Sequence, residues 1–114
     1  MAKAVRLNAK QGNTFSFTVF LKDPVTELAY NLTGKSLVFY VNSPTPISKN
    51  TGTVGSGFVV TDAVNGQATL TLTATETRAL EYGSYQYEVE LRDNGNQTTI
   101  MEGAFYVAKG FNID

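Results

Sequence analysis

The sequence predicts an all-β protein, a sandwich or barrel of about seven strands with one short helix. Apolar and polar residues alternate with a period of two along most of the chain, which is typical of strands with one buried face. Turn residues separate these runs at intervals of roughly 8–15 residues, as in β-sandwiches and barrels. At 114 residues, with no linker or repeat to divide it, we expect one domain spanning residues 1–114.

The first half of the chain contains one weak and two clear strand patterns. A weak strand is expected at residues 4–7. The next two runs place apolar residues at every other position: Phe15, Phe17, Val19 and Leu21, then Leu37, Phe39 and Val41. Between these two runs, Asp23-Pro24 and Leu32-Thr33-Gly34 supply turn chemistry.

Residues 43–57 interrupt this regularity. The segment contains Pro44 and Pro46, three glycines and many hydroxyl side chains. Such a composition is typical of a connection rather than of a strand or helix. We therefore expect a long connection here, and the most mobile part of the domain.

The second half contains four strand patterns, at residues 58–61, 68–72, 85–91 and 98–107. Asn65-Gly66 and Asn94-Gly95 stand before or between these runs, and Asn-Gly is the strongest short-range hairpin signal. The alternation along all the strands predicts which side chains form the core: Phe17, Val19, Leu37, Phe39, Leu70, Leu72, Tyr87, Val89 and Phe105.

One segment, residues 73–80, breaks the β pattern. Thr73 is a candidate helix N-cap, and Glu76 follows three residues later, which is the spacing of a capping box. We expect a crossover helix of about two turns joining strands of opposite sheets, with Leu80 pointing into the core.

Composition excludes several classes of function. The chain has no cysteine and no histidine, so it lacks thiol chemistry, the usual general base near neutral pH and the commonest metal ligand. Nine basic and ten acidic residues leave a net charge of −1, which argues against nucleic acid as a partner. No apolar run has the length of a signal peptide or a membrane span. We expect no enzyme, no cofactor, no metal, no nucleic-acid partner and no membrane partner.

Two groups of polar residues are possible sites. Glu88 and Glu90 share one strand face, with Arg92 next along, so they could form a catalytic or sugar-binding row. The sequence implies no apolar pocket around them, which favours the solvated face of an antiparallel strand. The Asp93–Asn96 segment contains calcium-ligand residue types but lacks the spacing of a calcium loop, so it is interpreted as a turn.

Aromatic residues are the feature with binding potential. Phe20, Tyr40 and Tyr106 fall on strand positions that should face solvent. They are candidate interface residues, since aromatic side chains are enriched in interface cores. Two alternatives stay open. One is a sugar-stacking platform, and the other is that a bulge shifts the strand parity or that the rings are isolated, exposed and without a role.

Several segments together resemble a known family. They are Gln11–Phe15, Asn31–Phe39, Asn65–Thr73, Glu76–Leu80, Gly83–Leu91 and Gly103–Val107. Their order and spacing resemble the small immunoglobulin-like β-sandwich modules of tailed-phage virion proteins. The most similar known modules are the N-terminal domain of siphophage baseplate upper proteins and related tail, fibre and head-decoration proteins. The resemblance covers residues 10–108 and implies an immunoglobulin-like antiparallel β-sandwich.

The resemblance also implies a function. We expect a structural protein of a tailed-phage virion, acting in baseplate, tail or fibre attachment or in capsid decoration through protein–protein contacts. Its partners would be other virion subunits, either as a homo-oligomer or docked on a larger assembly. Its location would be the virion, after synthesis in the host cytoplasm. The alternative is a carbohydrate-binding β-sandwich module used in adhesion to the host surface. The family's members usually continue into a fibre or neck region, so the chain is either a stand-alone subunit or a fragment.

Overall fold

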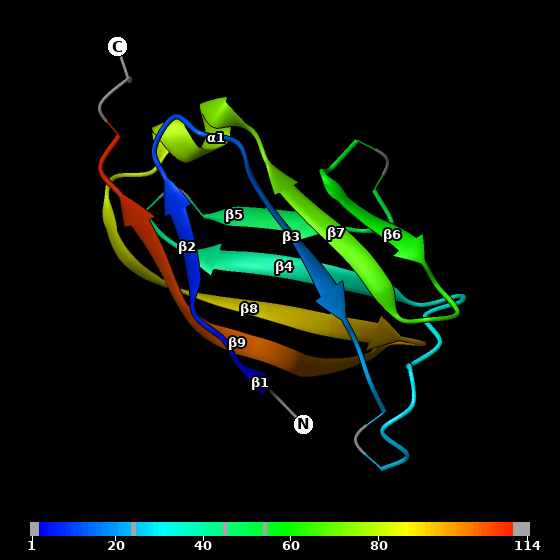
Figure 1. Cartoon of the computed structure of the whole chain (residues 1–114). Coiled ribbons are helices and arrows are strands. Elements are labelled where there is room, and N and C mark those ends of the chain that lie inside the picture. The colour runs from blue at the N-terminus through cyan, green and yellow to red at the C-terminus, as the bar shows by residue number, and fades with distance from the viewer. Residues whose placement is uncertain (1–2, 24, 45, 54, 111–114) are drawn as a thin grey trace.

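Two β-sheets pack face to face in the computed structural model, which describes residues 3–23, 25–44, 46–53 and 55–110 (Figure 1). The larger sheet has the order β1-β9-β8-β4-β5, with β2 also paired to β9, and the smaller sheet has the order β3-β7-β6. A short helix, α1, covers one end of the sandwich (Figure 1). The strands are β1 Lys3–Ala4, β2 Leu7–Lys10, β3 Phe15–Phe20, β4 Ser36–Asn42, β5 Ile47–Asn50, β6 Phe58–Asp62, β7 Gln67–Leu72, β8 Gly83–Asp93 and β9 Asn96–Ala108. The sandwich and its short helix confirm the predicted fold class.

The core lies between the two sheets and is built from the side chains that alternation assigns to the inside. Phe39 on β4 is fully buried, with ring centroids 5.9 Å from Tyr87, 6.2 Å from Phe105 and 6.4 Å from Phe17. Eight of the nine predicted core residues are buried and the ninth, Phe17, is half-buried against the core. Among the described residues, no helix is long and apolar enough to cross a membrane.

The N-terminal segment differs from the predicted antiparallel arrangement. β1 and β2 both run parallel to β9, and Val5 and Arg6 separate them, so the strand expected at residues 4–7 is two short strands. Gly103 on β9 permits this close approach. Its φ is +154°, and a Cβ atom there would lie 2.4 Å from the carbonyl oxygen of Val5. Pairing with β9 therefore depends on a glycine near the middle of that strand.

The connection at residues 43–57 contains a strand that the sequence did not predict. β5 pairs antiparallel with β4, with Val41 opposite Ile47 and Val38 opposite Asn50. A side chain also links the residues after β5 to the end of that strand, because Ser56 Oγ donates a hydrogen bond to the Asn50 carbonyl at 2.7 Å. The mobility expected for this segment stays a prediction. The prolines and glycines correctly predicted turns in this segment. They gave no indication of the four-residue strand that lies between those turns.

The long hairpin of β8 and β9 has the predicted Asn94-Gly95 turn. Asn94 has a φ of 50° and Gly95 a φ of 85°, which are the positive values of a two-residue type I′ turn. The register of the β8–β9 pair shifts between Val89 and Glu90 of β8, where β9 has one extra residue. This bulge turns Ile100 inward, where it is only 4% exposed, although alternation from Met101 assigns it outward.

The helix α1, Ala74–Ala79, joins β7 of one sheet to β8 of the other, as predicted. Thr73 and Glu76 form the predicted capping box, because each side chain accepts a hydrogen bond from the other residue's backbone N–H. Leu80 is buried in the core, also as predicted. Thr77 is fully buried, and its hydroxyl donates to the Asn13 carbonyl at 2.8 Å. This bond fixes the helix to the turn between β2 and β3.

Candidate binding surfaces

The outer face of the large sheet carries Tyr40 on β4, the strand between β8 and β5. Its neighbour across the sheet is Glu88 on β8, which in turn lies opposite Glu102 on β9. The Tyr40 hydroxyl accepts a hydrogen bond from Arg92, and the guanidinium carbon of Arg92 lies 6.0 Å from the ring centroid. Val38, on the same outer face, is only 1% exposed. This part of the face is therefore packed rather than freely solvated.

A row of carboxylates runs beside Tyr40. Burial raises the pKa of Glu88, and the negative charges of Glu90 and Glu102 raise it further. Arg92 lies 3.4 Å from Glu90 and offsets part of the repulsion. The side chains of Glu88 and Glu90 share one outward face, as predicted, but both are half-buried rather than fully solvated.

An open groove of about 410 Å³ runs along this row. It is lined by Tyr40, Val41, Asn42, Pro46, Gln86, Tyr87, Glu88 and Glu102. An aromatic edge beside amide and carboxylate groups can accept hydroxyl-rich ligands, because these groups pair with hydroxyls as donors and acceptors. Arg92 already occupies one approach to the Tyr40 ring, which reduces the surface available for stacking.

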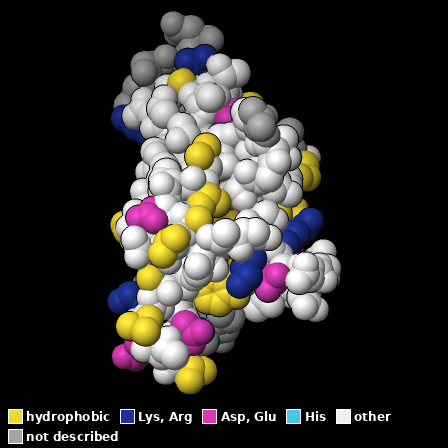
Figure 2. Space-filling model, turned by 90° about the vertical axis from the view of Figure 1, so that its right-hand side faces the viewer, with side chains coloured by type: hydrophobic (Ala, Val, Ile, Leu, Met, Phe, Trp, Pro, Cys, Tyr) yellow, Lys and Arg dark blue, Asp and Glu magenta, His cyan; other side chains and the backbone are white. Residues whose placement is uncertain are grey.

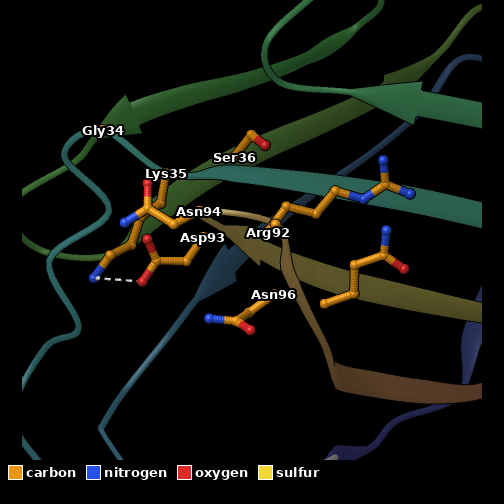
Figure 3. A pocket seen from close by; sticks show the side chains of 9 residues that line it. Gly34, Lys35, Ser36, Arg92, Asp93, Asn94 and Asn96 are labelled. Carbon is orange, nitrogen blue, oxygen red and sulfur yellow. Dashed lines mark ion pairs between the residues drawn. The ribbon is translucent and has the colours of Figure 1, made fainter.

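A second hollow, of about 440 Å³, lies at the tip of the β8–β9 hairpin beside the start of β4 (Figure 3). Its lining is polar: Gly34, Lys35, Ser36, Arg92, Asp93, Asn94, Gly95, Asn96 and Gln97. Lys35 Nζ lies 3.8 Å from the Asp93 carboxylate and donates to the Tyr30 hydroxyl at 3.1 Å. The hydrogen bond to Tyr30 raises the pKa of Lys35. In Figure 3 the Arg92 side chain extends away from Lys35 and Asp93, so the two cations do not converge.

A third groove, of about 310 Å³, separates β5 from α1 and is lined by Pro46, Ile47, Ser48, Lys49, Glu76, Ala79 and Leu80. The ion pair between Lys49 and Glu76 spans it. Burial raises the pKa of Glu76, but the hydrogen bonds from Lys49 and from the Thr73 backbone outweigh burial and hold that pKa below its ordinary value. This ion pair bridges the edge of the large sheet and the helix.

The three candidate interface residues do not meet. Tyr40 and Tyr106 face the same side of the large sheet, but β8 and four positions of register separate them. Phe20 is 65% exposed on the outer face of the other sheet. Tyr106 is 38% exposed, and the Arg6 guanidinium carbon lies 5.1 Å from its ring centroid. Each tyrosine therefore has an arginine partner, whereas no cation of the described residues lies over the Phe20 ring.

The outer face of the small sheet is lined with hydroxyl groups. Thr18 and Thr69 lie side by side with their oxygens 3.2 Å apart, and Ser16 and Thr71 with theirs 3.4 Å apart. Val59 on β6 is 57% exposed in the same row. Figure 2, which shows the β6 side of the molecule, has separate hydrophobic side chains scattered among polar atoms. No single apolar patch dominates this side.

The described residues contain no group of three or more Asp or Glu side chains placed to hold a metal ion. The sequence reasoning missed Glu102, because its proximity to Glu88 arises from pairing across the β8–β9 hairpin. Counting outward along both strands from the Asn94-Gly95 turn would pair Glu88 with Met101 instead, because the bulge lies between the turn and this pair. It also missed the contact of Arg92 with Tyr40, which no local pattern could have found, since β4 and β8 are far apart in the chain.

Comparison with known proteins supports the fold. No protein-family model matches the chain, and no curated protein matches it in sequence. Among solved structures, the N-terminal domain of phage TP901-1 ORF48 is similar with a TM-score of 0.57 and 13% identity, over 94% of this chain and 86% of that one. A candidate glycoside hydrolase from Bacteroides vulgatus is similar with a TM-score of 0.54 and 8% identity, over 93% of this chain. The match covers only 17% of that protein. The chain thus has a β fold that is found in a phage protein domain, which supports the family resemblance at this coarser level.

Proposed function

We propose that the chain is a structural protein of a tailed-phage virion, acting in baseplate, tail or fibre attachment or in capsid decoration. It would act as a rigid sandwich that contacts other virion subunits or copies of itself. The observation that carries this proposal is the structural similarity to a domain of a phage protein. The similarity covers 94% of this chain and 86% of that domain. Because likeness at this identity concerns the fold, the role itself needs a direct test.

The strand order supports an immunoglobulin-like module. Immunoglobulin sheets have the orders A-B-E-D and C-F-G, with an added C′ in the variable type. Taken in chain order, β3-β7-β6 corresponds to B-E-D, and β9-β8-β4-β5 corresponds to G-F-C-C′. The N-terminal strands pair with β9, so the position of strand A beside β3 has no strand among the described residues.

The outward aromatic residues would provide contacts. In the proposed role, alanine at Phe20, Tyr40 or Tyr106 weakens attachment to the virion by about 2 kcal/mol where the ring is an interface anchor. Tyr82, which is 60% exposed on the segment between α1 and β8, provides the matched control for loss of an exposed ring. The amount of each variant in purified virions, with the melting temperature of the isolated protein, is the measurement. Normal incorporation of all three variants would exclude the aromatic contacts, and absence of the wild-type chain from virions would exclude the virion role.

A second candidate function is carbohydrate binding, which the groove beside Tyr40 favours. Its lining places a tyrosine edge next to two carboxylates and two side-chain amides. A glycan array probed with the wild-type protein and with Glu102→Gln and Tyr40→Ala variants tests this candidate. Glycan binding that both variants abolish, together with absence from virions, would replace the structural role with the adhesion role.

A further inference from the structure

The free edge of β3 presents main-chain groups that no other described segment pairs. β3 pairs only with β7 among the described strands and forms the outer strand of the front sheet in Figure 1. Just beyond β3, the Leu21 N–H donates toward β7, to the Gly66 carbonyl at 2.8 Å. Successive residues of an antiparallel strand point their N–H and C=O groups to opposite sides. The groups of Ser16, Thr18 and Phe20 therefore point away from β7, to the open edge.

The other strand edges of the sandwich carry features that block pairing. β6 has a register shift between Val60 and Asp62 and ends in a charge. β5 carries Lys49, whose ion pair with Glu76 links that edge to α1. β1 and β2 are short and are interrupted between Ala4 and Leu7. Natural proteins use such charges, bulges and short strands to prevent association at sheet edges.

β3 has none of these features. Its six residues, Phe15–Phe20, contain no charge and no proline, and its register with β7 is regular throughout. An exposed strand edge without charges, prolines or bulges is a template for another strand. The absence of protection at this one described edge distinguishes it from the others.

Two inward side chains of β3 are less buried than the inward side chains of its neighbour β7. On β7, the inward residues Ala68, Leu70 and Leu72 are fully buried. On β3, the inward Val19 is buried, but the inward Phe15 and Phe17 pack against the core and are only half-buried. These two rings lie on the strand whose outer edge no described segment covers. A further strand beside β3 would cover these two rings.

We propose that β3 pairs with β3 of a second copy of this chain, antiparallel and about a two-fold axis. The two small sheets then form one continuous six-stranded sheet, β6-β7-β3 followed by the same strands of the partner in reverse order. Thr18 lies opposite Thr18 of the partner subunit. Ser16 of each copy lies opposite Phe20 of the partner subunit. The residues whose main-chain groups point to the open edge are Ser16, Thr18 and Phe20. Each of them then makes both of its main-chain hydrogen bonds across the interface.

Two properties of the strand favour a second copy as the occupant. First, the strand is uncharged, so pairing with itself brings no like charges together. Second, this register keeps Phe17 opposite Val19 of the partner subunit on the buried face, and places hydroxyl residues opposite each other or opposite Phe20 on the outer face. A shift of this register by one residue would place buried-face residues of one copy opposite outer-face residues of the other. The two-fold contact is closed, so it forms a dimer and not a fibre.

This inference deepens the proposed function, since it names one protein–protein contact of the virion subunit. Cross-linking tests the contact directly. The chain has no cysteine, so a Thr18→Cys variant carries a single thiol, and two such thiols would lie within reach of a short bis-maleimide across the axis. Val59→Cys is the matched control, because Val59 occupies the same outer row of the same sheet at its other edge. We expect covalent dimers with Thr18→Cys and not with Val59→Cys.

Charge placed at the axis tests the register. A Thr18→Lys variant brings two ammonium groups together, and we expect dimerisation to weaken about tenfold or more in sedimentation velocity runs. Mixing the Thr18→Lys and Thr18→Glu variants restores a dimer, because opposite charges then meet. Val59→Lys, the matched control, leaves dimerisation unchanged. Circular dichroism of each variant confirms that it is folded.

Three results would overturn the proposal. One is a wild-type protein that stays monomeric at every concentration without Thr18→Cys cross-links. Another is a dimer that Thr18→Lys leaves intact, and the third is cross-linking through Val59→Cys instead. Virion incorporation is measured separately with the same variants. A monomer whose incorporation Thr18→Lys abolishes would assign β3 to a different virion subunit, whereas a dimer absent from virions would refute the virion role and leave the contact standing.

Discussion

The side chain of Gln11 hydrogen-bonds the end of the helix, because its Nε2 donates to the Leu80 carbonyl at 2.7 Å. Its Oε1 accepts a hydrogen bond from the Gly110 N–H at 3.2 Å. Gln11 is only 6% exposed, so water does not replace these partners easily. One side chain thus joins the β2–β3 turn, the end of α1 and the segment after β9. These three segments close the same end of the sandwich (Figure 1).

Replacing Gln11 tests the importance of this contact. In Gln11→Leu, the Leu80 carbonyl and the Gly110 N–H lose their side-chain partners while buried. A buried polar group without a partner costs about 1–3 kcal/mol, so we expect a loss of stability of at least that size in urea unfolding. Gln97→Leu, an exposed glutamine-to-leucine change on β9, should alter stability by less than about 0.5 kcal/mol. Equal losses of stability in Gln11→Leu and Gln97→Leu would contradict a stabilising role for the two hydrogen bonds of Gln11.

Phe39 tests the assignment of the core. Its ring is fully buried and contacts three other aromatic rings. Phe39→Ala should reduce the free energy of unfolding by about 3–5 kcal/mol, through lost burial and the cavity left behind. Chemical denaturation of the isolated protein measures it. A loss below about 1 kcal/mol would be typical of a surface position and would contradict the packing described.

Tyr87 links the core to the N-terminal segment, since its hydroxyl donates to the Val5 carbonyl at 2.6 Å. Burial raises the pKa of Tyr87 from 10.0 to about 12. A raised pKa in the folded state gives stability that is complete below the ordinary value of 10.0 and is lost as pH rises through about 12. We therefore expect the wild type to lose stability over this range, measured by thermal melting.

The Tyr87→Phe variant is the control for that titration. It cannot ionise, so it should lack this part of the alkaline loss. It also lacks the hydrogen bond to Val5, and at neutral pH it should be less stable than wild type by about 1 kcal/mol. Parallel alkaline melting curves for the two proteins would show that another group causes the transition.

Glu88 offers a test in the acidic range. Burial and the charges of Glu90 and Glu102 raise its pKa above the ordinary value of 4.5. The ionised carboxylate therefore destabilises the fold, an effect absent below 4.5 that grows as pH rises through the folded-state pKa. Glu88→Gln should stabilise the protein at neutral pH by about 0.2–1 kcal/mol, the scale of like charges opposed across strands.

The difference between Glu88→Gln and wild type should disappear at a pH well below 4.5, where both side chains are neutral. Thermal melts of the two proteins at neutral and acidic pH measure it. Glu81→Gln, an exposed change outside the row, serves as the control and should have no such pH-dependent effect. A stabilising effect of Glu88→Gln that persists in acid would have to arise from packing instead of charge.

Much of the fold could be predicted because its signals are local. The capping box needs only Thr73 and Glu76, which lie within one helical turn. The β8–β9 turn needs only Asn94 and Gly95, which tolerate positive φ. Alternation assigns Phe39 inward and Tyr40 outward, because successive side chains of a strand point to opposite faces.

The candidate surfaces were less predictable. The sequence places Phe20, Tyr40 and Tyr106 on outward positions, and the structure agrees that none is fully buried. The sequence alone does not show which of these rings another side chain covers. Arg92 lies against Tyr40 and Arg6 against Tyr106, and the two partners of each pair come from separate strands or segments.

By itself, the sequence determined the β character, the turns, the capped helix and the inward face of each main strand, since each depends on neighbours within a few residues. Only the tertiary structure decided that Lys3–Ala4 and Leu7–Lys10 run parallel to β9, that Ile47–Asn50 extends the large sheet and that a bulge buries Ile100. It also decided that no described segment pairs with the outer edge of β3. These features depend on which distant strand lies alongside, and hydrogen bonds between strands carry no signal in the local residue pattern.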